Sequence, residues 1–184
     1  DCLPRHCEQL RRRPGKIEHG VEKVGLHGRR PADERQMLVH FRDRQGPGHP
    51  ACGNGVDAAL AQLFTCNLVN RFEEDRPALP ALTLGTENAC ITAIAQSGSI
   101  DDIFSRQLRA LGQAEDILLC INSSRGAGNL LRAVQTAQDR NMGVILLSNT
   151  RDGDLGALIG PEGVQLQVHA TRQARIVEIH TMVI

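Results

Sequence analysis

Two glycine-containing turns carry the residue types that bind phosphate. Residues 52–55 read Cys-Gly-Asn-Gly, and residues 122–128 read Asn-Ser-Ser-Arg-Gly-Ala-Gly. Glycine lets the backbone approach a ligand, serine hydroxyls donate hydrogen bonds, and the N-terminus of a helix favours an anion. The residue types leave two interpretations open at the second turn, an anion site or a helix cap that binds no ligand.

The elements that must position these turns alternate between helices and apolar strands. Apolar residues recurring three and four positions apart predict helices at 56–72, 88–96, 100–111, 128–141 and 155–159, and from residue 172 onward. Segments rich in apolar residues predict buried strands at 79–84 and 116–121, and further strands are expected at 143–147 and 164–168. This alternation predicts an α/β fold for residues 51–184, a parallel sheet with helices on both faces. Ligands of such sheets bind at the carboxyl ends of the strands.

The first fifty residues have a different composition. They hold 11 of the 21 basic residues against 7 acidic ones, together with five of the seven His and five of the eight Pro. Without a helical or alternating pattern, residues 1–50 are expected to be an atypical basic segment that packs poorly or is translated out of frame. Residues 46–50, Gly-Pro-Gly-His-Pro, are interpreted as breakers. The spacing of Cys2, His6, Cys7 and His19 fits no standard zinc module.

Bulk composition excludes several classes of protein. Basic and acidic residues are equal at 21 each, which argues against direct nucleic-acid binding. The longest apolar run, Val144–Leu147, is too short to cross a membrane, and no signal peptide is recognised. Six Cys without repeated spacing are expected to be reduced thiols. We therefore expect a cytoplasmic protein.

Several motifs in this chain resemble one family. In order they are Cys52-Gly53-Asn54-Gly55, Asn70-Arg71-Phe72-Glu73, Thr92-Ala93-Ile94-Ala95, Arg109-Ala110-Leu111-Gly112 and Ala174-Arg175-Ile176. They resemble the sugar-isomerase (SIS) domain proteins of the phosphoheptose isomerase group, most of all the branch that associates with the replication initiator DnaA. The resemblance covers residues 51–184 and implies a flavodoxin-like sheet in a homotetramer. Residue 184 is expected to fall within the last helix of the domain.

The catalytic residues of the isomerases do not carry over. Where the family has His, Glu and Gln, this chain has Leu63, Asn67 and Val177. Isomerisation of a ketose phosphate needs a base and a polarising metal, and these side chains supply neither. His180 matches the last motif and is expected to be a buried core or interface residue. We therefore expect no catalytic residue, no metal and no cofactor, with zinc the cofactor only if the isomerase activity holds.

The phosphosugar site that the resemblance implies is altered. Its residues here are Gly53, Asn54, Gly55, Ser123, Ser124 and Arg125. Asp57 replaces a family serine, and its charge is expected to repel an anion. Arg125 either offsets this loss with a bidentate phosphate contact or is simply solvated.

Two functions are consistent with these substitutions. The first is a non-catalytic SIS domain that acts through protein contacts, with a DnaA-type initiator as partner and a homo-oligomeric state. The alternative is a D-sedoheptulose 7-phosphate isomerase whose site tolerates unusual residues.

Overall fold

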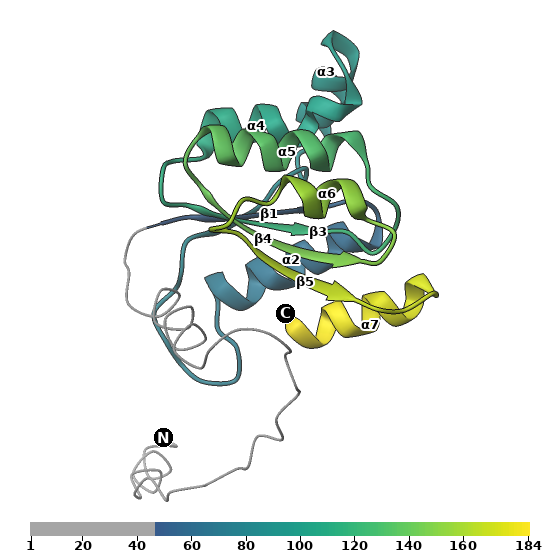
Figure 1. Ribbon diagram of the computed structural model, residues 1–184. Coiled ribbons are helices and arrows are strands. Elements are labelled where there is room, and N and C mark those ends of the chain that lie inside the picture. The colour runs from purple at the N-terminus through teal and green to yellow at the C-terminus, as the bar shows by residue number, and fades with distance from the viewer. Residues whose placement is uncertain (1–46) are drawn as a thin grey trace, which may run out of the picture. The chain divides into compact units, whose positions relative to one another are not determined.

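The computed structural model describes residues 47–184, which form one α/β unit (Figure 1). Its sheet has five strands in the order β2-β1-β3-β4-β5, and every neighbouring pair is parallel. The strands are β1 (His49–Gly53), β2 (Ala81–Thr83), β3 (Ile117–Ile121), β4 (Gly143–Asn149) and β5 (Val164–Val168). The predicted parallel α/β fold is therefore confirmed.

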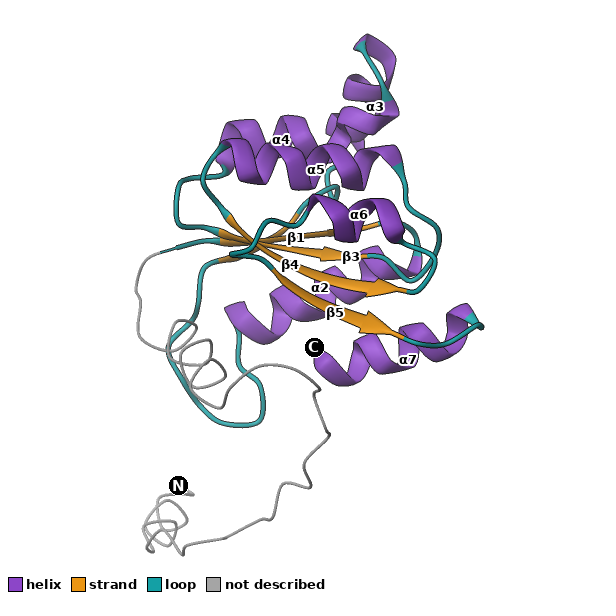
Figure 2. Ribbon diagram, viewed as in Figure 1, coloured by secondary structure: helices purple, strands orange, loops and turns teal. Residues whose placement is uncertain are grey.

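Helices cover both faces of this sheet (Figure 2). They are α2 (Val56–Val69), α3 (Asn88–Ser97), the 3-10 turn η1 (Ile100–Asp102), α4 (Ile103–Leu111), α5 (Gly128–Asp139), α6 (Gly153–Leu158) and α7 (Gln173–Val183). In the view of Figure 1, α4, α5 and α6 lie above the sheet, and α2 and α7 lie below it. Within the described residues, no helix has the length and apolar character needed to cross a membrane.

Two hydrophobic clusters, one on each face, hold the layers together. The larger joins the sheet to α4, α5 and α6 through fully buried side chains such as Leu108, Leu130 and Leu155. The smaller packs Leu60 and Ala61 of α2 against the opposite face. Because apolar side chains emerge on both sides of the central strands β3 and β4, these two strands read as continuous apolar runs.

The interpretation of residues 46–50 as breakers is wrong for its last two positions. His49 and Pro50 begin β1 and are buried, so the expected boundary between residues 50 and 51 falls inside a strand. β1 contains no β-branched or aromatic residue, and its pairing with β2 and β3 supplies what its local sequence lacks. Proline near the start of a strand costs only one donor. Residues 1–46, with the cysteines and histidines near their start, lie outside the described residues.

Helix α2 ends three residues earlier than predicted. The Arg76 guanidinium donates hydrogen bonds to the carbonyls of Asn67 and Leu68 in the last turn of this helix. These carbonyls have no partner within the helix, and a cationic donor satisfies them. The chain then crosses to the edge strand β2, which is shorter than the predicted 79–84.

Candidate functional site

The fold brings the two predicted turns together at the carboxyl ends of adjacent strands. Gly53 is the last residue of β1, and Ser123 follows the end of β3. The side-chain amides of Asn54 and Asn129 bond each other reciprocally, with both N···O distances 2.9 Å. This pair ties the loop after β1 to the first turn of α5.

Two glycines shape the first turn. A Cβ atom at position 53 would lie 2.6 Å from the backbone carbon of Asp57, so only glycine lets the strand end this close to α2. Gly55 precedes α2 with a φ of 59°, a conformation that favours glycine. Glycine was expected to let the backbone approach a ligand; at Gly53 it lets the backbone approach the chain's own helix.

Asp57 points its carboxylate into the second turn. Its Oδ2 accepts a hydrogen bond of 2.9 Å from the Ser123 backbone N–H, and the residue is 1% exposed. Its Oδ1 has no hydrogen-bond partner among the described residues. Burial raises the pKa of this carboxyl, while the Ser123 hydrogen bonds and the nearby His180 oppose the rise. A carboxylate thus already occupies a backbone donor that an anionic ligand would use.

The two serines of the second turn are also partnered within the chain. Ser123 is buried, and its Oγ accepts a hydrogen bond of 3.1 Å from Gln173 Nε2 at the start of α7. The Ser124 hydroxyl lies 3.2 Å from Asn122 Oδ1, to which it donates. Sequence reasoning missed Gln173, because α7 is 50 residues away along the chain.

A polar network behind this turn was also missed. The Asn122 amide donates to Asp152 Oδ2 at 2.7 Å, and Asn149 Nδ2 donates to the carbonyls of Asn122 and Ser124. Burial raises the pKa of the Asp152 carboxyl. Asn149 ends β4 and Asp152 follows it, as the predicted turns follow β1 and β3, so polar residues directly after the apolar run 143–147 were the available signal.

Arg125 is exposed and lines the open part of the site. It borders a polar cavity of about 430 Å³ together with Gly126, Arg151, Asp152 and Asp154. The site therefore has two parts. The inner part, around Ser123, is closed by the chain's own side chains, and the outer part, at Arg125, is open.

His180 is a buried residue, as predicted. It is 0% exposed, and its Nε2–H donates a 3.2 Å hydrogen bond to the Ser148 carbonyl at the end of β4. Burial lowers the pKa of this imidazole, and the hydrogen bond to Ser148 and the charge of Asp57 oppose the shift. Its Nδ1 has no hydrogen-bond partner among the described residues.

The three substituted positions lie on the helices below the sheet. Leu63 on α2 is 39% exposed, and Asn67 donates from Nδ2 to the Ile184 carbonyl at 3.4 Å. Val177 on α7 packs against the hydrophobic cluster of that face. Residues 47–184 contain no group of three or more His, Cys, Asp or Glu arranged to hold a metal ion. Leu and Val offer no ligand atom, so the residues present do not fit a zinc ion.

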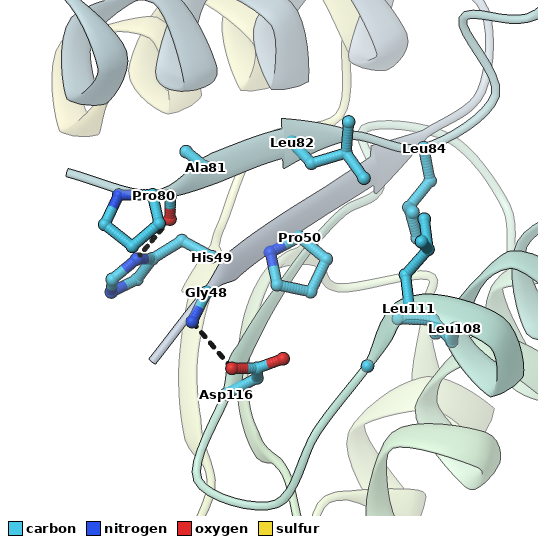
Figure 3. A pocket seen from close by; sticks show the side chains of 11 residues that line it. Gly48, His49, Pro50, Pro80, Ala81, Leu82, Leu84, Leu108, Leu111 and Asp116 are labelled. Carbon is cyan, nitrogen blue, oxygen red and sulfur yellow. Dashed lines mark hydrogen bonds between the residues drawn. The ribbon is translucent and has the colours of Figure 1, made fainter. Parts of the chain in front are cut away.

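A second cavity, of about 220 Å³, lies at the opposite end of the sheet (Figure 3). Pro50 and Leu82 line it from β1 and β2, and Leu108 and Leu111 from α4. Asp116 closes one side by accepting the Gly48 N–H at 2.6 Å. Because this cavity is apolar and lies at the amino ends of the strands, it is separate from the predicted turns.

Comparison with known proteins identifies the family. The SIS domain family matches residues 49–149, which span β1 to β4 and both turns. The chain belongs to the SIS-domain family. The resemblance of its motifs to this family is confirmed.

Relatives of this SIS-domain chain carry two different names. A phosphoheptose isomerase of Chromohalobacter salexigens is 45% identical over 149 residues, covering 81% of this chain and 75% of the relative. The DnaA initiator-associating protein DiaA of Photorhabdus laumondii is 41% identical over 133 residues, covering 72% of this chain and 68% of the relative. The family is therefore shown, and the names alone do not choose between the two functions.

Solved structures agree with the fold. A phosphoheptose isomerase from Francisella tularensis superposes with a TM-score of 0.75 at 35% identity, covering 83% of this chain and 81% of the other. The phosphoheptose isomerase GmhA of Neisseria gonorrhoeae gives 0.73 at 33% identity, covering 82% and 78%. The SIS-domain architecture thus extends over the described residues.

Proposed function

We propose that this chain is a non-catalytic SIS domain that acts in the cytoplasm through protein contacts, with a DnaA-type replication initiator as its partner. The observation that carries the proposal is the identity of three residues on α2 and α7. Leu63, Asn67 and Val177 stand where the isomerase pattern has ionisable or metal-binding side chains. A proton transfer beside a carbonyl needs a base, and none of these side chains is one at neutral pH.

The DiaA relatives support the choice of partner. Proteins of this name from Photorhabdus laumondii, Enterobacter and Escherichia coli are 41–42% identical to this chain over 133 residues. Their name describes association with DnaA. A protein that keeps the SIS fold without the isomerase residues fits that role better than catalysis.

Exposed apolar residues on α2 and α7 support a homo-oligomer. Six of the ten large hydrophobic side chains exposed in the described residues lie on these helices: Val56, Leu63, Val69, Ile179, Met182 and Val183. Met182 is 86% exposed. Such side chains gathered on two neighbouring helices are typical of a protein contact surface.

Weak phosphosugar binding without turnover is part of this proposal. Its residues are Gly53, Asn54, Gly55, Ser123, Ser124 and Arg125. The open cavity beside Arg125 supports it, since a guanidinium binds phosphate in a bidentate manner. The internal partners of Ser123 oppose tight binding.

The proposal is tested by measuring the binding of Escherichia coli DnaA to the immobilised chain by surface plasmon resonance. DiaA of Photorhabdus laumondii serves as the positive control, and the phosphoheptose isomerase of Chromohalobacter salexigens as the matched negative control. We expect saturable binding within tenfold of that of DiaA. If DiaA binds DnaA and this chain does not, the proposed partner is wrong.

The alternative function is D-sedoheptulose 7-phosphate isomerisation. Its support is the 45% identity to a phosphoheptose isomerase and the isomerases among the solved structures. It requires a base and a metal ligand set other than those that the family pattern supplies. Zinc-dependent turnover would establish it.

A further inference from the structure

We propose that Asp57 determines which ligands the candidate site accepts: its carboxylate fills the anion position of the loop between β3 and α5 and so disfavours phosphomonoesters. This inference rests on the phosphosugar part of the proposed function. It attributes the low affinity for phosphosugars to the side chain of Asp57.

The position that Asp57 fills is one that attracts anions. The Oδ2 of Asp57 accepts a hydrogen bond of 2.9 Å from the Ser123 backbone N–H, just beyond the carboxyl end of β3. Asp57 is also the second residue of α2, where unpaired N–H groups and the helix dipole favour negative charge. A phosphate entering here would meet the same donors, so it competes with the carboxylate for them.

Close packing and internal hydrogen bonds surround Asp57. Gly53 packs so closely that a Cβ there would lie 2.7 Å from the Asp57 Cβ. Gln173 donates a hydrogen bond to the Ser123 hydroxyl oxygen, and the hydrogen-bonded pair of Asn54 and Asn129 joins the two loops. Asp57 is 1% exposed, so a phosphate reaches the Ser123 amide only by displacing a buried carboxylate of like charge.

Only one of the two carboxylate oxygens of Asp57 is hydrogen-bonded within the described residues, a pattern that Asp152 in the neighbouring network shares. Buried carboxylates that serve only stability normally have both oxygens hydrogen-bonded. Asp116, at the other end of the sheet, accepts backbone N–H groups at 2.6 and 2.8 Å with its two oxygens. Asp57 has one bonded oxygen and one without a partner in the described part of the chain. Replacement of Asp57 therefore removes a buried charge that holds one donor of the turn.

The test compares Asp57→Ser with Asp57→Asn in the full chain. A serine side chain is too short to reach the Ser123 N–H, so it frees this donor. Asparagine keeps an oxygen on the donor but removes the charge. Asp139→Ser, an exposed acid at the end of α5, is the control for net charge.

Inorganic phosphate and sedoheptulose 7-phosphate are titrated at pH 7.5 while the Ser123 amide is followed by ¹H–¹⁵N NMR. We expect Asp57→Ser to bind both at least tenfold tighter than the unaltered chain, with a shift of the Ser123 amide. Asp57→Asn should gain less than threefold, and Asp139→Ser nothing. Equal gains in Asp57→Ser and Asp57→Asn, or no gain in Asp57→Ser, would overturn the proposal.

The unaltered chain supplies a second measurement if Asp57→Ser does not fold. Phosphate up to 10 mM should not saturate any shift of its Ser123 amide resonance, and saturation below 10 mM would contradict the proposal. DnaA binding is measured separately on the same samples. A chain that fails to bind DnaA but gains phosphate affinity on Asp57→Ser refutes the proposed partner and leaves the role of Asp57 intact.

Discussion

Removing the amide pair between Asn54 and Asn129 is expected to uncouple the two loops of the candidate site. Each amide donates one bond and accepts one, at 2.9 Å in both directions. A net protein hydrogen bond contributes about 1 kcal/mol, so the pair is worth about 2 kcal/mol. Asn129 is 7% exposed, so Asn54→Ala leaves a nearly buried amide unsatisfied, and the expected loss of about 2 kcal/mol lies within the range of about 1–3 kcal/mol for such a group.

A double-mutant cycle measured by urea unfolding separates these contributions. Each single alanine variant is expected to lose about 2 kcal/mol of unfolding free energy, and the double variant about 2–3 kcal/mol because it leaves no orphaned amide. The coupling energy is therefore about 1–2 kcal/mol. Asn54→Ala combined with Gln135→Ala, an exposed residue on the same helix α5, is the additive control. Coupling below about 0.5 kcal/mol in the Asn54–Asn129 cycle would refute the bridging role.

Three further predictions concern packing, pH and thiol access. Gly53→Ala should lower the free energy of unfolding, measured in urea, by about 3 kcal/mol, because the new Cβ would lie 2.6 Å from the backbone of α2. The control Gly153→Ala has open space around it and should change the free energy of unfolding by less than about 0.5 kcal/mol. Burial lowers the pKa of His180 below its usual 6.5, so the folded state binds fewer protons than the unfolded state. The free energy of unfolding should therefore fall as the pH drops below about 6.5, and this fall should be smaller in His180→Gln. Identical pH profiles of the two proteins would contradict a lowered pKa at His180. Mass spectrometry after brief treatment with a maleimide should find exposed Cys66 labelled at least tenfold faster than buried Cys52, and equal rates would show that β1 is accessible.

Local sequence patterns encoded most of the fold. The segments 79–84, 116–121, 143–147 and 164–168 predicted four of the five strands, and the two central ones, β3 and β4, are apolar runs because buried parallel strands need apolar side chains on both faces. β1 escaped detection because His49 and Pro50 are poor strand formers by themselves. Its strand conformation depends on pairing with β2 and β3, which approach from later in the chain.

The position of the candidate site could be predicted from the sequence, but the internal hydrogen bonds that occupy its donors could not. The glycines and serines located both turns, since turns after parallel strands gather at one edge of the sheet. Whether their donors were available depended on Asp57 and Gln173, which contact Ser123 across 66 and 50 residues of sequence. No local pattern encodes such contacts. Like charge at Asp57 was expected to repel an anion, and the structure places its carboxylate on the Ser123 donor itself.

The most direct test of the non-catalytic account is a turnover assay with sedoheptulose 7-phosphate and added zinc. The purified chain is compared with the phosphoheptose isomerase of Chromohalobacter salexigens, with and without a chelator. With Leu63, Asn67 and Val177 in place of the isomerase residues, we predict no product above the rate without enzyme, while the isomerase turns over. Product formation by this chain that the chelator abolishes would contradict the account.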